Sequence, residues 1–207
     1  MRRRYKAVVI GTSAGGIEAS VYIFGRLPAQ FPLPIFLVQH LHKDQDNSLV
    51  RLYKNCTQLK VEEAEEKERV LPGHLYIAPP DYHILLERDE TLSLSVDEKV
   101  NYSRPSIDVL FESAADVYGP ELIGVLMTGA NHDGAHGLQK IKKYGGLTVI
   151  EDPATAKFPE MPKSALACTE ADYILPLEEL ADCLLALAED CSAGPAGRDR
   201  LSNLSRC

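Results

Sequence analysis

A serine in a glycine-rich turn is the first residue of the chain that can do nucleophilic chemistry. Ser13 stands in the run GTSAGG, residues 11–16, between an apolar stretch and a stretch with helical spacing. The G-x-S-x-G pattern places a serine on a sharp strand-to-helix turn with its hydroxyl exposed. The positive end of the following helix points at the same place, where it would stabilise a developing oxyanion. Neither glycine-rich phosphate-binding spacing is present, so the run indicates either a nucleophile or a turn that only lets the helix pack closely.

A histidine and an aspartate follow two other apolar runs in the same way. His40 comes directly after PIFLVQ, and Asp133 comes after LIGVLMT, within the turn TGANHDG. Because the active residues of an open parallel sheet gather at the carboxyl ends of its strands, we expect these two residues to lie beside Ser13. In such a set the histidine takes the serine proton and the aspartate fixes the tautomer of the histidine. The sequence therefore predicts a Ser-His-Asp triad for acyl transfer.

Simpler explanations exist for each of these residues. His40 alone is compatible with a satisfied histidine at a strand end, and Asp133 with the N-cap of the helix that follows it. Asp152, after the later apolar run LTVI, is a rival for orienting the histidine. His40, His42 and Asp44 also form an H-x-H-x-D cluster of residue types that bind zinc. A metal-dependent hydrolase is therefore an alternative, although it leaves the serine without a role.

The order of apolar runs and helical stretches predicts the scaffold for these residues. Strand-like runs and stretches of helical spacing alternate along the chain, which is typical of a layered α/β domain. The strand-like runs are apolar at consecutive positions, so both of their faces are covered, as in a parallel sheet. The predicted strands are Tyr5–Ile10, Pro34–Gln39, Leu122–Thr128 and Leu147–Ile150. The predicted helices begin near Ile17, Ser48 and Gly134, and a further one spans Leu177–Ala188.

The middle of the chain has a different pattern. The runs His83–Leu86 and Thr91–Val96 flank a charged turn, and the second run alternates between apolar and polar residues. This pattern predicts an exposed antiparallel hairpin appended to the main sheet. Helical spacing resumes afterwards, and we expect a helix that opens at Pro105 with Ser103 as its cap. Met161-Pro162 is interpreted as part of a loop.

The composition narrows the class of protein and its location. The chain has 207 residues, with 22 Lys plus Arg and 30 Asp plus Glu, which gives a formal charge of −8. This acidic balance argues against binding of nucleic acid, and no apolar run approaches the ~18 residues of a membrane span. The five cysteines form no Cys-x-x-Cys pair, and no export signal is visible, so we expect free thiols in the cytoplasm. We expect one catalytic domain over residues 1–191 and a flexible tail over residues 192–207.

Ordered blocks of sequence extend from about Tyr5 to Leu187, among them VVIGTSAGG, FLVQHLH, APPDYHILL, SRPSIDVLFESAA and MPKSAL. In this order they resemble the chemotaxis protein-glutamate methylesterase family, the CheB type. The resemblance implies a three-layer α/β/α domain with a mostly parallel, doubly wound sheet. It also implies a serine esterase that needs no cofactor, hydrolyses glutamate γ-methyl esters on the cytoplasmic helices of chemoreceptors, and deamidates certain glutamines there. Matched motif by motif, the catalytic residues of the family fall on Ser13, His40 and Asp133.

Two features depart from the family pattern. The usual Thr-Gly-Met-Gly-x-Asp-Gly loop reads TGANHDG here, so Ala130 and Asn131 replace its methionine and its second glycine. Together with Ala14, these two residues form the predicted substrate and oxyanion region. Family members usually carry an N-terminal receiver domain, which we do not expect here because the first strand begins at Tyr5. The altered loop keeps open a catalytically silent domain that docks on receptor helices, and the oligomeric state is also left open.

Overall fold

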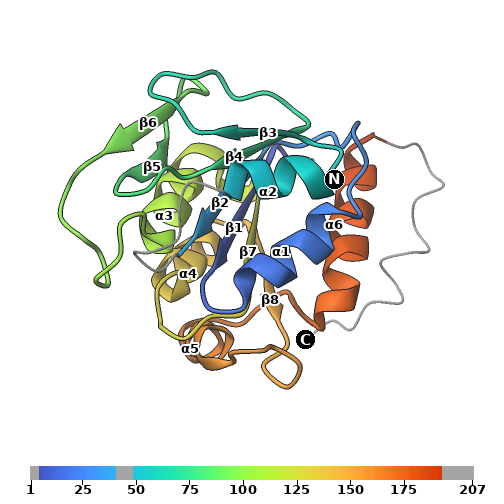
Figure 1. Cartoon of the computed structure of the whole chain (residues 1–207). Helices are drawn as coiled ribbons and strands as arrows, with labels where there is room; N and C mark the ends of the chain where they lie inside the picture. Colours follow the sequence, from blue (N-terminus) through green and yellow to red (C-terminus); the bar gives the residue numbers. More distant parts are fainter. Residues whose placement is uncertain (1–4, 41–48, 193–207) are drawn as a thin grey trace.

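A seven-stranded sheet forms the centre of the protein (Figure 1). The structure, a computed structural model, describes residues 5–40 and 49–192. Every pair of neighbouring strands in this sheet is parallel. In spatial order the strands are β3 (Lys60–Glu63), β4 (His74–Ile77), β2 (Ile35–Gln39), β1 (Ala7–Thr12), β7 (Leu122–Leu126), β8 (Leu147–Glu151) and β9 (Tyr173–Leu175).

Helices cover both faces of the sheet, which gives the protein three layers (Figure 1). One face is covered by α1 (Gly16–Phe24), α2 (Leu49–Cys56) and α6 (Leu177–Ser192). The other face is covered by α3 (Ile107–Tyr118), α4 (Ala135–Lys143) and α5 (Glu160–Cys168). In residues 5–40 and 49–192, no helix has the length and apolar character of a membrane span.

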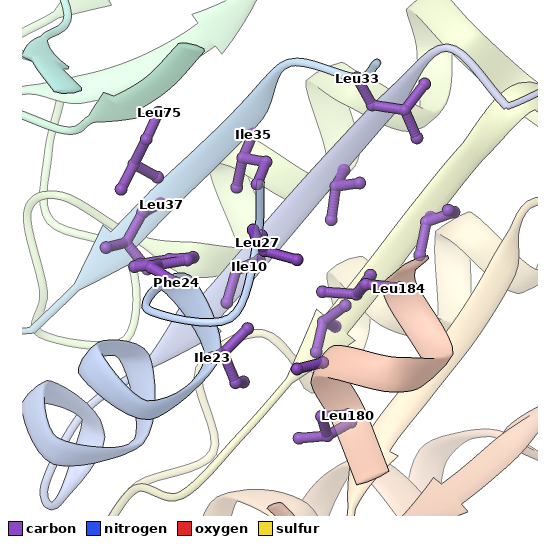
Figure 2. Close-up of a cluster of buried hydrophobic side chains, with 14 of the residues drawn as sticks. Ile10, Ile23, Phe24, Leu27, Leu33, Ile35, Leu37, Leu75, Leu180 and Leu184 are labelled. Carbon is purple, nitrogen blue, oxygen red and sulfur yellow. The ribbon is translucent and has the colours of Figure 1, made fainter. Parts of the chain in front are cut away.

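Successive residues of the central strand β1 point into two different layers. Val8 and Ile10 belong to the apolar cluster that β1 shares with α1, α2 and α6, part of which is drawn in Figure 2. Ala7 and Val9 belong to the cluster on the opposite face, with α3, α4 and α5. All four side chains are fully buried. Burial on both faces explains why consecutive residues of the strand are apolar, and not only alternate ones.

The topology brings the three predicted catalytic residues to one edge of the sheet. From β1 the chain passes to β2 on one side, and it later enters β7 on the other side of β1. In open α/β sheets, ligands bind outside the carboxyl ends of the strands where the strand order reverses in this way. Ser13 follows β1, His40 follows β2, and the turn with Asp133 follows β7.

The structure confirms the predicted layered fold with a parallel sheet. The four predicted strands are β1, β2, β7 and β8, with ends that differ by two residues or fewer. Four of the five predicted helices are α1, α2, α4 and α6, and the fifth, expected from Pro105, is α3. The prediction did not include β3, β4, β9 or α5. Met161 and Pro162 lie in the first turn of α5, so their assignment to a loop was wrong. The predicted tail beyond residue 192 and the segment 41–48 lie outside the described residues.

The predicted hairpin exists, but it is neither fully exposed nor part of the main sheet. Strands β5 (His83–Leu86) and β6 (Leu92–Ser95) pair antiparallel as a separate two-stranded sheet. Ile84, Leu86 and Leu92 are buried in the same cluster as the apolar face of α3. The hairpin is therefore half-buried because it extends the apolar layer that α3 forms.

Helix α3 begins later than the sequence prediction placed it. Its cap is Ser106, not Ser103: the backbone of Ser106 is extended and its Oγ accepts from the N–H of Val109 at 3.5 Å. Pro105 lies just before this cap and outside the helix. A serine with extended backbone is a favoured N-cap because its hydroxyl satisfies an N–H group of the first turn. The shift matters because the first N–H groups of α3 contact the candidate site.

Candidate active site

The turn after β1 fixes the backbone of Ser13 but not its hydroxyl. The N–H of Ser13 donates to the carbonyl of Thr128 at 3.0 Å, and Gly15, with φ 76°, adopts the left-handed conformation that leads the chain into α1. The Ser13 side chain is half-buried. Among the residues that the structure describes, its hydroxyl has no hydrogen-bond partner. The serine is thus held in place while its oxygen is left available.

His40 leaves the neighbouring strand beside Ser13. Strands β1 and β2 are in register with Thr12 opposite Gln39, and the N–H of His40 donates to the carbonyl of Thr12 at 3.0 Å. Adjacent strands lie about 4.8 Å apart. Ser13 and His40, which follow Thr12 and Gln39, therefore lie side by side. The amide of Gln39 strengthens this arrangement, because its Nε2 donates to the carbonyls of Ser13 and His40, each at 2.9 Å.

Asp133 is fully buried at the N-terminus of α3. Its Oδ2 accepts from the N–H of Ile107 at 2.7 Å, and its Oδ1 accepts from the Ser106 hydroxyl at 2.9 Å and the N–H of Asp108 at 3.2 Å. The amide of Asn101 donates to the same Oδ1 at 3.0 Å. The positive end of a helix stabilises an anion, so α3 holds this carboxylate in its charged form.

The two buried aspartates beside α3 have pKa values that move in opposite directions. Burial raises the pKa of Asp133, but the contact with His40 and the hydrogen bond from Asn101 outweigh it, and the pKa lies below its usual value. Burial also dominates at Asp108, where it raises the pKa despite hydrogen bonds from the Gly137 N–H and the Asn101 amide. Of the two carboxyl groups, Asp133 is consequently the one that ionises more readily.

The side chains of His40 and Asp133 meet. The Nε2 of His40 lies 3.0 Å from Oδ2 of Asp133, with 11% of the histidine side chain and none of the aspartate exposed. Within the described residues Nε2 makes no hydrogen bond of good geometry, so the contact is a close approach of the two groups. Catalytic contacts of this kind are often loose before substrate binds. The other ring nitrogen, Nδ1, lies 3.2 Å from the amide nitrogen of Asn131.

Backbone N–H groups are available near the serine hydroxyl. Within the described residues, the N–H groups of Ala14 and Ala130 donate no hydrogen bond, whereas the N–H of Gly129 donates to the carbonyl of Phe158 at 3.0 Å. Gly129 packs closely on the turn that holds Ser13, because a Cβ built on Gly129 would lie 3.0 Å from Cβ of Ser13. These features make Ala14 and Ala130 candidates for oxyanion donors.

Of the two sequence alternatives, one lies elsewhere and the other rests partly on residues outside the described ranges. The Asp152 carboxylate accepts from the N–H of Ala154 at 2.8 Å, and Asp133, not Asp152, contacts His40. His42 and Asp44 of the proposed metal cluster lie outside the described residues. No group of three potential metal ligands is found among residues 5–40 and 49–192.

Three side chains with a supporting role were not predicted. Gln39 ends an otherwise apolar strand, and a polar residue at that position is a visible signal in the sequence. Ser106 is a recognisable N-cap candidate once the helix start is placed correctly. Asn101 gives no such signal, because its contact with Asp133 depends on a left-handed backbone at φ 49° in a long loop.

Comparisons with known proteins identify the family of this chain. The CheB methylesterase family model matches residues 8–184. A Leptospira interrogans protein, provisionally named protein-glutamate methylesterase/protein-glutamine glutaminase, is 51% identical over 186 residues, which are 90% of this chain and 96% of that protein. The Thermotoga maritima protein-glutamate methylesterase/protein-glutamine glutaminase is 38% identical over 88% of this chain, and the match spans 54% of the relative.

A solved structure gives the same result for the fold. The crystal structure of the Thermotoga maritima CheB methylesterase catalytic domain superposes with a TM-score of 0.84 at 38% identity. The match covers 88% of this chain and 98% of that domain. The three layers described above are therefore shared with a domain of known architecture.

Proposed function

This chain belongs to the CheB methylesterase family, and from that premise we propose that Ser13, His40 and Asp133 are its catalytic residues. The proposed reaction is hydrolysis of glutamate γ-methyl esters on the cytoplasmic helices of chemoreceptors, with release of methanol. The observation that carries the proposal is the 3.0 Å contact between His40 and the buried Asp133. His40 follows the strand next to that of Ser13, whose hydroxyl makes no hydrogen bond in the described part of the chain.

The proposed mechanism follows from the position of each group. Ser13 Oγ attacks the ester carbonyl carbon while its proton passes to Nδ1 of His40, the ring nitrogen that does not face Asp133. The Asp133 carboxylate stabilises the resulting imidazolium. Collapse of the tetrahedral intermediate breaks the bond to the methoxy oxygen, which leaves as methanol with the proton from His40. Water, activated by His40, then hydrolyses the glutamyl ester on Ser13.

The N–H groups of Ala14 and Ala130 are the proposed donors to the oxyanion. Neither N–H donates a hydrogen bond within the described residues, and Ala14 immediately follows the proposed nucleophile. A preorganised donor of this kind contributes about 10²–10³ in rate in other acyl-transfer enzymes.

The same acyl-enzyme forms from glutamine with loss of ammonia, so we include protein-glutamine deamidation in the proposal. We place the reaction in the cytoplasm, where the receptor helices are.

Methanol release from a methylated chemoreceptor tests the proposal. We expect the wild-type chain to release methanol and Ser13→Ala to lose several orders of magnitude in rate, as other triad enzymes do. Ser20→Ala is the matched control, because it makes the same chemical change in α1 at a buried serine away from the strand ends. Near-normal activity of Ser13→Ala contradicts the assignment of the nucleophile. Receptor binding without any methanol release identifies a docking domain instead.

A further inference from the structure

The amide of Asn131 contacts both the ring of the proposed base, His40, and the backbone of Asp133. Its Oδ1 accepts from the backbone N–H of Asp133 at 3.1 Å, and its Nδ2 lies 3.2 Å from Nδ1 of His40. The first contact is a turn in which an asparagine oxygen bonds the N–H two residues later, which is a common local structure. Because that contact needs the oxygen, the amide nitrogen must face the histidine ring.

This orientation decides which nitrogen of His40 carries the proton. An amide NH₂ group can only donate, so the Nδ1 that it faces must accept through its lone pair. A neutral imidazole then has its proton on Nε2, which lies 3.0 Å from the carboxylate of Asp133. Asn131 and Asp133 therefore select the same tautomer from opposite sides of the ring.

The same contact occupies the electron pair that Ser13 needs. A neutral imidazole has one in-plane lone pair, and in the structure it faces the Asn131 amide, while the Ser13 hydroxyl has no partner in the described residues. We propose that Asn131 is a positioning residue that caps the lone pair of His40 Nδ1, so that its amide must move aside before Ser13 can transfer its proton. This inference rests on the proposed function of His40 as the general base.

The cap also opposes the charge that develops during the reaction. Once the serine proton arrives, Nδ1 becomes an N–H donor and faces a second donor, the amide of Asn131. Two opposed donors repel, so the contact favours the neutral ring over the imidazolium. Asn131 therefore holds His40 in the correct tautomer at rest and slows the proton transfer itself.

Two substitutions at one position separate this role from a structural one. Asn131→Ala removes the amide, and we expect kcat for methanol release to rise about two- to tenfold, the range that one ordinary hydrogen bond contributes, with KM unchanged. Asn131→Asp keeps an oxygen for the Asp133 N–H but puts a carboxylate against Nδ1, which favours a proton there. We expect that variant to lower kcat. His132→Ala, which removes an exposed side chain of the same loop, is the control and should leave kcat unchanged.

Nitrogen-15 NMR of the histidine rings tests the cap without any activity measurement. The six histidines are distinguished by comparison with a His40→Gln spectrum. In wild type we expect His40 Nδ1 to resonate as an unprotonated nitrogen that accepts a hydrogen bond, and in Asn131→Ala as one that does not. Identical His40 spectra in the two proteins, or a fall of kcat in both variants, overturn the cap. A wild-type chain that releases no methanol contradicts the proposed function, and the spectra then decide the cap alone.

Discussion

Two turns of the molecule have a similar backbone but differ in the surroundings of one side chain, Ser13 in the first turn and Asp133 in the second. The turn after β1 and the turn after β7 each end on a glycine in the left-handed conformation, Gly15 at φ 76° and Gly134 at φ 94°. Each opens a helix of nine residues without a side-chain cap. The first turn leaves the Ser13 hydroxyl without a described partner, whereas the second buries Asp133 under donors from α3 and the loop before it.

The difference follows from what each group does in the proposed reaction. A nucleophile changes its bonding partner at every step, so hydrogen bonds made at rest have to be broken. An orienting carboxylate keeps its charge and its position throughout, and burial without donors would neutralise it. One strand-turn-helix design therefore serves both roles, and the elements packed on the turn decide which role each has.

Substitution of the two key side chains should separate activity from stability. Asp133→Asn lowers methanol release by about 10⁴-fold, as in other triads. It also lowers the free energy of unfolding by about 2–5 kcal/mol, because an NH₂ group replaces an oxygen that accepts from buried donors. Ser13→Ala is expected to change that free energy by less than about 0.5 kcal/mol, since its hydroxyl has no described partner. If urea unfolding shows equal losses of free energy in Asp133→Asn and Ser13→Ala, the two turns do not differ in this way.

The two left-handed glycines should differ in their tolerance of a methyl group. A Cβ on Gly134 would lie 2.6 Å from Cγ2 of Ile107 and from Cδ1 of Leu126, both buried. A Cβ on Gly15 would lie 3.1 Å or more from its neighbours, of which Phe158 is partly exposed. Both alanine variants lose about 1–2 kcal/mol to the left-handed backbone, and we expect Gly134→Ala to lose about 1–3 kcal/mol more through overpacking.

Thermal or urea unfolding of Gly134→Ala and Gly15→Ala measures this difference directly. The comparison of the turns predicts the larger loss at Gly134, where α3 covers the turn. If Gly15→Ala loses more free energy of unfolding than Gly134→Ala, the turn after β1 is the more tightly packed of the two, which contradicts this prediction.

The smallest expected effect is on the pH dependence of the free energy of unfolding, and it involves Glu151, a second buried acid beside the turn after β7. Burial raises the pKa of Glu151 above its ordinary value, although the N–H of Thr128 donates to it at 2.7 Å. The folded state then holds the proton more tightly than the unfolded chain, so ionisation costs stability as the pH rises through that ordinary value. Gln keeps an oxygen for Thr128 and has no charge. Glu151→Gln is therefore expected to be more stable than wild type at pH 7, with the advantage lost near pH 4.

Unfolding free energies of Glu151→Gln and wild type at the two pH values check this sign. Asp133 behaves in the opposite sense, because its lowered pKa gives stability that is present above its ordinary value and is lost as the pH falls below it. An advantage of the glutamine variant that grows toward low pH would show that the carboxylate of Glu151 is stabilised like that of Asp133.

The scaffold could be predicted wherever one simple pattern described it. Strands β1, β2, β7 and β8 are apolar at consecutive positions because they are buried on both faces, and a run of that kind is visible in the sequence. Strand β3 is a four-residue edge strand with the sequence KVEE, and the prediction did not include it. Such a strand is formed by pairing with a neighbour, which no local pattern records.

The candidate site divides in a similar way. Ser13, His40 and Asp133 were predicted from their places after apolar strands. These three strands are neighbours in the sheet, and their carboxyl ends lie at one edge of it. The contacts that hold them come from loops: Asn101 reaches Asp133 from a left-handed backbone, and Asn131 reaches His40 across its own turn. Side-chain contacts between loops depend on tertiary packing, so spacing along the chain does not reveal them.

The most direct test of the account is whether Ser13 and His40 act as one unit. Methanol release is measured for wild type, Ser13→Ala, His40→Gln and the double variant. Residues that share one step are strongly non-additive, so the account predicts that each single change lowers the rate by several orders of magnitude and that the double variant is no slower than either. Losses that multiply in the double variant would show two independent contributions and would contradict a serine activated by this histidine.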